Sequence, residues 1–234
     1  MKNIINSAIT VSLAAATLLF PALSAHAEIH SKSKELVVME ARDLPEQAQA
    51  RGNSLLLHSD NAGSTYLYVE QKQGTRLAVF DVTDPARIKL TASTSLPAEG
   101  SFDFVRPLGE NAELVYFRNG QKAAILDLHK VKQPVLRPLS ITADLDAAET
   151  LGHSGLLATN ESYKYIPAVA HDFQVIDISS ANPALLVTLK DVRHRLTNND
   201  TGTTFFLCKD GLTVVRRTSV ENDYKVHQMQ MQGN

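Results

Sequence analysis

The sequence predicts an all-β fold: a small β-propeller-like repeat structure with about four blades of short antiparallel strands. Two observations support this prediction. Short runs rich in Val, Ile, Leu, Tyr and Phe alternate with turn residues such as Gly, Asn and Asp along most of the chain, which is the pattern of many short strands. In addition, one apolar strand recurs four times with a similar ending, and an internal repeat indicates stacked supersecondary units.

The repeated strand ends in an acidic residue in three of its four copies. The copies read LAVFD at 77–81, AAILD at 123–127, FQVID at 173–177 and LTVVR at 212–216. Their ends lie 46, 50 and 39 residues apart, which brackets the roughly 40–45 residues of a four-stranded propeller blade. We interpret the acidic residues and the prolines that follow them as structural anchors of the repeat, namely Asp81, Asp127, Asp177, Pro85, Pro134 and Pro183.

The individual elements follow from this framework. We expect strands at the apolar runs 36–39, 54–57, 66–69, 77–82, 102–105, 113–117, 123–128, 185–189 and 204–208. Asn119–Gly120 is the clearest hairpin turn, because both residues tolerate the positive φ of a type I′ turn. Helical signal is weak and is confined to a turn or two over 43–51 and over 144–150. The strand 36–39 is left over from the four units, and we expect it to pair with the last blade.

Residues 1–27 have the pattern of a secretory signal peptide. Lys2 precedes an apolar run over 8–20, Pro21 ends this run, and Ala25 and Ala27 are small residues at the positions that signal peptidase reads. We therefore expect cleavage after Ala27, a single propeller-like domain over 28–234, and localisation in a bacterial periplasm or outside the cell. No later segment is long and apolar enough to span a bilayer.

The net charge narrows the possible classes of partner, and the cysteine content narrows the possible cysteine chemistry. The formal net charge is −2 for the whole chain, and loss of Lys2 with the signal peptide makes it −3. This mild negative charge argues against nucleic acid or an anionic membrane surface as the main partner. Cys208 is the only cysteine, so the chain has no internal disulfide, and its apolar neighbours Phe206 and Leu207 favour a buried thiol over a nucleophile.

The repeat resembles the LVIVD repeat of β-propeller proteins, in which a strand of the form Leu-x-Val-Val-Asp-Val leads into Ser/Thr-x-Pro. The resemblance is close at Arg76–Pro85, contains a two-residue insertion at Asp172–Pro183, is weaker at Lys122–Pro134 and is lost in the last copy. It covers about residues 36–230 and implies an architecture rather than an activity. The turns that begin at Ser59 and Asn198 also resemble the Asp-box turns of several propeller families, with Asn61 in the Asp place of the first, which implies that they cap hairpins.

The sequence contains no recognisable catalytic, cofactor or metal motif. No two mature histidines have a short ligand spacing, and calcium loops, nucleophile elbows, Walker loops and dinucleotide-binding glycines are absent from the sequence. We therefore expect no catalytic residue, cofactor or metal. The most divergent loop is 160–170, and it contains two candidate partner-binding residues, Tyr163 and Tyr165. The other candidates are two arginines that follow this loop in the chain, Arg193 and Arg195, and Arg216, which replaces the aspartate in the last copy of the repeat.

These features favour a periplasmic, non-enzymatic binding protein with a protein partner. One specific form of this hypothesis is an immunity-type protein that neutralises a toxin. Two alternatives stay open. The first is a hydrolase or lyase with a site at the mouth of the propeller channel, where Arg, Tyr, Asp and His would have to meet. The second is a structural half-ring that completes a propeller by forming a homodimer.

Overall fold

The computed structural model describes residues 28–119, 122–139, 144–151, 155–159, 168–179 and 182–232. The predicted signal peptide, Tyr163, Tyr165 and Gly120 of the predicted hairpin turn lie outside these residues. None of the described helices is long and apolar enough to cross a membrane.

The predicted all-β class is confirmed. The first repeat forms a sheet of β3 (Gly52–Ser59), β4 (Thr65–Gln71), β5 (Arg76–Asp81) and β6 (Lys89–Ser95), and the second forms one of β7 (Phe102–Pro107), β8 (Ala112–Phe117), β9 (Ala123–Asp127) and β10 (Val135–Leu139). Both sheets are antiparallel, with their strands in chain order.

The fourth repeat recruits strands from the start of the described chain. Its sheet has the order β1 (Ile29–His30), β2 (Leu36–Met39), β17 (Gly211–Arg217), β16 (Thr203–Cys208) and β15 (His194–Asn198). The expected pairing of 36–39 with the last repeat is confirmed, with Val38 opposite Val215. This pairing covers an edge of β17 that would otherwise be open to other strands.

The third repeat is divided into two separate hairpins. One contains β11 (Asp144–Leu151) and β12 (Gly155–Thr159), and the other contains β13 (His171–Asp177) and β14 (Ala184–Val192). The helical turn expected at 144–150 is therefore wrong, because this segment is strand β11 and Thr150 pairs with Leu156. A segment of seven residues is too short to hold a helix alone, so strand pairing determines its conformation.

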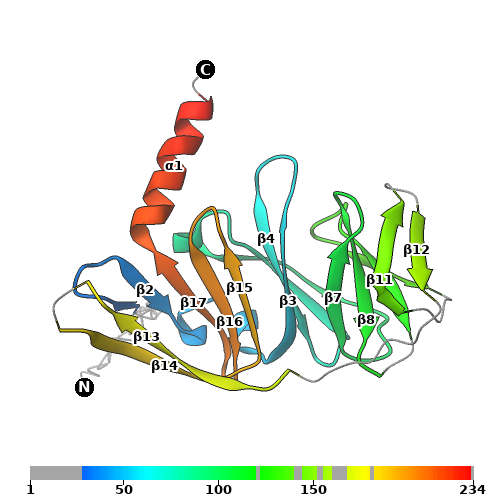
Figure 1. Ribbon diagram of the computed structural model, residues 1–234, viewed down its shortest axis with the longest axis horizontal. Helices are drawn as coiled ribbons and strands as arrows, with labels where there is room; N and C mark the ends of the chain where they lie inside the picture. Colours follow the sequence, from blue (N-terminus) through cyan, green and yellow to red (C-terminus); the bar gives the residue numbers. More distant parts are fainter. Residues whose placement is uncertain are drawn as a thin grey trace, which may run out of the picture.

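Helices are few in the described residues. The expected turn within 43–51 corresponds to two short 3-10 helices, η1 (Ala41–Asp43) and η2 (Glu46–Gln49), and a third, η3 (Pro85–Arg87), follows β5. The sequence did not predict α1 (Thr218–Gln232), which continues directly from β17. Figure 1 shows α1 projecting away from the sheets, with the C-terminus at its tip.

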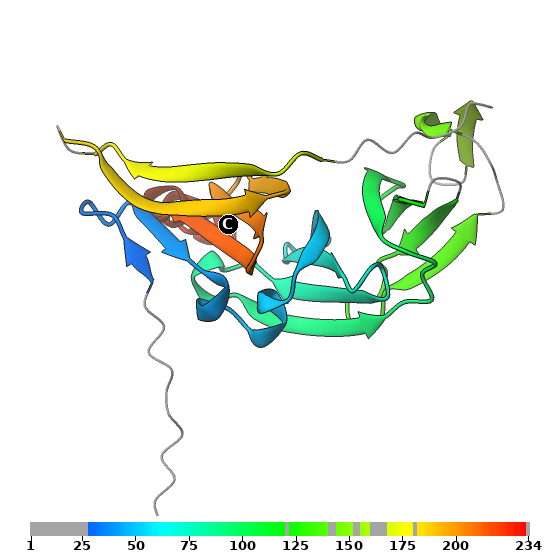
Figure 2. The ribbon, with the colours of Figure 1, turned by 90° about the horizontal axis from the view of Figure 1, so that it is seen from below.

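The sheets of the fourth, first and second repeats form an arc (Figures 1 and 2). Their inner strands β15, β3 and β7 are neighbours, and the Ser54 hydroxyl in β3 donates a hydrogen bond of 2.8 Å to the Phe102 carbonyl in β7. The two hairpins of the third repeat lie at opposite ends of this arc in both views. The described strands therefore do not form a closed ring.

The first three repeat strands end in the same turn. The Oδ1 atoms of Asp81, Asp127 and Asp177 accept hydrogen bonds from the backbone N–H two residues later, at 3.0, 3.1 and 2.9 Å. Such Asx turns redirect the chain after a strand, which makes the three aspartates turn anchors. In these three repeats the following proline comes shortly before the last strand, since Pro134 and Pro183 directly precede β10 and β14 and Pro85 begins η3 before β6.

The turns that resemble Asp boxes cap their hairpins through their first acidic or amide side chain. Asp60 Oδ1 accepts hydrogen bonds from the N–H groups of Ala62 and Ser64, both at 2.9 Å. Asn61, which the sequence placed in the Asp position, instead donates to Glu110 at 3.1 Å. In the second turn the corresponding acceptor is Asn198, bonded by the N–H of Asp200 at 3.0 Å.

Candidate functional site on the third repeat

Successive sheets pack through fixed positions of the repeat strand. In β5, Leu77 and Val79 lie in a core cluster shared with the second-repeat sheet, whereas Phe80 and the next apolar residue, Val82, lie in a cluster shared with the fourth-repeat sheet. All four side chains are fully buried. Because neighbouring residues of a strand point to opposite faces, the first and third positions face the following sheet, and the fourth and sixth face the preceding one.

The second repeat follows the same rule. Leu126 and Leu128, which occupy the fourth and sixth positions, are buried in the cluster shared with the first-repeat sheet. Ala123, in the first position, lies in a different cluster on the opposite face, together with Leu114 and Tyr116. The rule therefore assigns a packing partner to each face of the third repeat as well.

The third repeat satisfies only half of this rule. Phe173 and Val175, in the first and third positions, pack in a cluster with residues of the fourth-repeat sheet. Ile176 and Ile178, in the fourth and sixth positions, are 43% and 79% exposed. Leu185, opposite Ile176 in β14, is 57% exposed. The face that should meet the preceding sheet is therefore uncovered, and we call it, together with the free edge of β13, the third-repeat surface.

The free edge results from a missing strand pair. Among the described strands, β13 pairs only with β14, and β12 only with β11. The corresponding strands of the first and second repeats, β4 with β5 and β8 with β9, are joined by turns of four and five residues. Eleven residues, 160–170, separate β12 from β13. The third repeat thus has two unpaired edges where the other repeats have a hairpin.

Polar contacts fix the β13–β14 hairpin to the fourth-repeat end of the arc. Asp177 is only 3% exposed, and its Oδ2 atom accepts a hydrogen bond from the Lys32 N–H, between β1 and β2, at 3.1 Å. Hydrogen bonds from Ser179 and then from Lys32 hold the pKa of Asp177 below its usual value. Asp177 therefore acts as an anion that ties the hairpin to the start of the domain.

The three predicted partner-binding residues that the structure describes lie in different environments. The Arg195 guanidinium lies 5.6 Å from the centre of the Phe173 ring, on the face of the hairpin that packs against the fourth-repeat sheet and opposite to Ile176. Arg193 lies 3.6 Å from the Asp191 carboxylate. Arg216 is buried and bonded to Glu221, so we assign it to the internal packing of the domain. The other two candidates, both tyrosines, lie outside the described residues.

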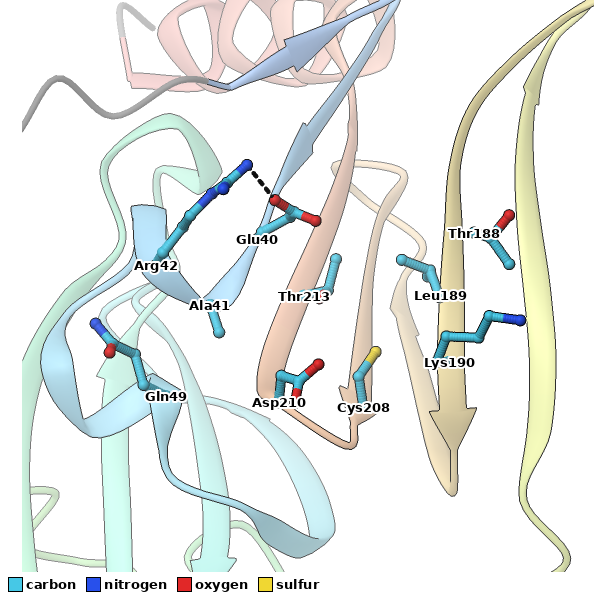
Figure 3. Close-up of a pocket in the computed structure, with 10 residues that line it drawn as sticks. All are labelled: Glu40, Ala41, Arg42, Gln49, Thr188, Leu189, Lys190, Cys208, Asp210 and Thr213. Atoms are coloured by element: carbon cyan, nitrogen blue, oxygen red, sulfur yellow. Dashed lines mark ion pairs between the residues drawn. The ribbon is translucent and has the colours of Figure 1, made fainter.

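A polar pocket of about 330 Å³ lies between β14 and the fourth-repeat sheet (Figure 3). Glu40 and Arg42 form an ion pair of 2.6 Å on one side of it, and Lys190 and Cys208 lie on the other. Burial raises the pKa of the Cys208 thiol, so this side chain is a poor nucleophile near neutral pH. The pocket marks the junction of the hairpin with the domain.

A second polar cluster lies where the inner strands meet. No sequence pattern predicted it, because its members come from three repeats. Arg118 donates to both carboxylate oxygens of Asp103, at 2.6 and 3.0 Å, and to the Asn53 carbonyl at 2.8 Å. Burial raises the pKa of nearby Glu70 to about 7 and lowers the pKa of His194. The cluster thus combines an ion pair with two groups, Glu70 and His194, whose charged forms are disfavoured by burial.

The described residues contain no group of three or more His, Cys, Asp or Glu side chains arranged to hold a metal ion. Comparison with protein-family models gave no match, and comparison with curated proteins gave none either. The functional argument therefore rests on the geometry of the chain itself.

Proposed function

We propose that this chain is an exported, periplasmic binding protein on a β-propeller-like scaffold, and that it recognises a protein partner through the third-repeat surface. The observation that carries the proposal is the exposure of Ile176 and Ile178. The equivalent side chains of the first two repeats are buried against a neighbouring sheet. The regular packing rule of the other repeats supports the propeller-like scaffold.

The chemistry of this surface suits an added strand or sheet. The unpaired edge of β13 offers backbone N–H and C=O groups, and strand addition uses these groups for affinity and side-chain contacts for specificity. Complete burial of one isoleucine side chain contributes about 1.5–3 kcal/mol. Three partly exposed apolar side chains, Ile176, Ile178 and Leu185, therefore provide a useful share of the binding free energy.

A neutralising role of the immunity type is one specific form of this proposal. A partner enzyme would dock on the third-repeat surface and reach around the edge of β13. On the opposite face of the hairpin it would meet Arg195, which packs on the Phe173 ring and would contribute a positive charge at the rim of the contact. Rim charges mainly affect the rate and salt dependence of association. This form therefore predicts binding that weakens with salt when the partner is acidic at the contact.

The proposal is tested by capturing partners from periplasmic extract with the purified mature chain. The double variant Ile176→Asp/Ile178→Asp should lose the partner. The matched control is Met229→Asp, because Met229 is an exposed apolar residue on α1, far from the hairpin along the chain. Circular dichroism establishes that all three proteins are folded. A partner retained equally by the isoleucine variant and by the control would overturn the proposal.

The central cluster supports a second candidate, a hydrolase or lyase with a site where the inner strands meet. Asp103 and Arg118 belong to the second repeat and His194 to the fourth-repeat sheet, and carboxylate, guanidinium and imidazole groups are common acid–base and charge-stabilising groups. We rank it second because Asp103 and Arg118 already satisfy each other through two hydrogen bonds. Turnover of ester, phosphoester or glycoside substrates that His194→Ala abolishes would favour it, and turnover unaffected by His194→Ala would count against it.

A further inference from the structure

We propose that the partner at the third-repeat surface is a second copy of this chain. In this arrangement β12 of each copy pairs with β13 of the other, so that two shared sheets form, each with β11–β12 from one copy and β13–β14 from its partner. The inference rests on the proposed function, because it assumes that the third-repeat surface binds protein, and it specifies which protein.

The packing rule of the repeats describes what this surface should contact. The fourth and sixth positions of a repeat strand face the preceding sheet, which for Ile176 and Ile178 is a second-repeat sheet with the β11–β12 hairpin beside it (Figure 1). Another copy of this chain carries both of these features in the required order. A foreign partner would have to reproduce them.

The chain's own β11–β12 hairpin does not occupy this place. It lies at the far end of the arc from β13–β14 (Figures 1 and 2). The β13–β14 hairpin is held at its own end by the Phe173 and Val175 cluster and by the bond between Asp177 and Lys32. Pairing within one chain would require the sheets of the arc to repack. Pairing between two copies allows each arc to keep its internal contacts, and unchanged backbones are the usual outcome of association.

The connection between the two hairpins permits exchange. Turns of two to five residues join the equivalent strands in the other repeats, and such short turns oblige the two strands to pair within one chain. The eleven residues of 160–170 impose no such restriction, since an extended segment of this length reaches roughly 36 Å. Exchange of identical elements is an inexpensive route to dimers.

Twofold symmetry leaves neither the β12 edge nor the β13 edge unpaired. Each copy offers one β12 edge and one β13 edge, so a twofold axis forms two identical contacts and closes the assembly. Open edges and exposed apolar faces otherwise promote uncontrolled association. A closed dimer therefore accounts both for the missing strand pair within the chain and for the exposed isoleucines.

The first test measures the mass of the mature chain by light scattering over a range of micromolar concentrations. The wild-type chain should have twice the mass of one chain, and Ile176→Asp/Ile178→Asp should shift it to the monomer mass. Met229→Asp should leave the dimer intact. A wild-type chain that is strictly monomeric at all concentrations would overturn the inference.

The second test distinguishes exchange from closure within one chain. In the first repeat Tyr68 lies opposite Val79, and the equivalent positions in the third repeat are Ala158 and Val175. The variant Ala158→Cys/Val175→Cys in a Cys208→Ser background is oxidised, and opposite strand residues are close enough for a disulfide. A covalent dimer supports the inference. A disulfide within a monomer would show that the chain closes its own ring.

A mixing experiment completes this test. Ala158→Cys and Val175→Cys are placed on separate Cys208→Ser chains, which are unfolded, mixed and refolded together. Formation of a covalent heterodimer supports exchange, and its absence contradicts it.

If the chain proves monomeric but still captures a foreign partner that Ile176→Asp/Ile178→Asp loses, the inference fails while the proposed function stands. If the wild-type chain neither dimerises nor captures a partner, both fail.

Discussion

Arg216 and Glu221 form a two-point ion pair that attaches α1 to the last strand. The guanidinium donates to both carboxylate oxygens, at 2.9 and 2.7 Å, and the two residues are 8% and 2% exposed. Arg216 occupies the position that Asp81 and Asp127 hold in the first two repeats. The change from aspartate to arginine thus replaces a turn with a helix, since the carboxylate now comes from the first turn of α1.

Removing one charge of this pair should destabilise the domain. Glu221→Gln leaves the buried Arg216 guanidinium with only its longer ion pair to Glu28, at 3.9 Å, and breaking the main buried pair in this way costs about 3 kcal/mol. Urea unfolding followed by circular dichroism measures the effect. The control Asp223→Asn changes an exposed carboxylate of the same helix and should shift the unfolding free energy by less than about 0.5 kcal/mol. Equal effects of the two variants would contradict the assignment.

A glycine at the contact between the first and second repeats should not tolerate substitution. Gly74 has φ of +86°, and a Cβ atom there would lie 2.0 Å from the Gly100 carbonyl oxygen. Gly63 has a similar φ of +81° but open space around it. We expect Gly63→Ala to cost about 1 kcal/mol from backbone strain alone and Gly74→Ala to cost clearly more. Thermal unfolding of the two variants compares them directly, and similar losses would refute the steric argument.

The contribution of Glu113 to the stability of the domain should fall as the pH rises from about 4.5 to 8. Burial raises the pKa of Glu113 from 4.5 to about 8. Between these values the unfolded chain releases a proton that the folded chain keeps, so each rise in pH favours unfolding. The contribution of Glu113 is therefore fully present below pH 4.5 and is lost above pH 8. Glu70, with a pKa of about 7, adds a loss of the same sign over a narrower range.

Substitution of Glu113 tests this dependence. Glu113→Gln should match the wild-type stability at pH 4 and exceed it at pH 9 by on the order of 3 kcal/mol. Urea unfolding at the two pH values gives the comparison. Glu46 is exposed, so Glu46→Gln should change stability by little at either pH. A Glu113→Gln advantage that does not depend on pH would point to a packing effect instead of a titration.

The strands and turn anchors could be predicted because they depend on local sequence. The copies LAVFD and FQVID both have strand periodicity, and Asp81 and Asp177 form the same turn. Whether Phe80 or Ile176 is buried depends on which sheet lies opposite, and this is decided by residues far away in the chain. The same holds for the central cluster, since Asp103, Arg118 and His194 share no spacing pattern. Helix α1 escaped prediction for a different reason: the segment 218–232 is mostly polar and lacks the regular apolar stripe of a core helix, although its ion pair joins residues only five positions apart.

The bond between Asp177 and Lys32 should control the mobility of the β13–β14 hairpin. Asp177→Ala removes the acceptor for both Ser179 and Lys32, so the hairpin loses its tie to the start of the domain. We expect faster hydrogen exchange across β13 and β14, with little change in the first-repeat sheet, because local opening depends on local contacts. Asp127→Ala is the matched control, since Asp127 bonds to His129 and Arg137 of the same repeat. Its effect should stay within the second repeat. Unchanged exchange of β13 and β14 in Asp177→Ala would mean that the apolar cluster around Phe173 alone holds the hairpin in place.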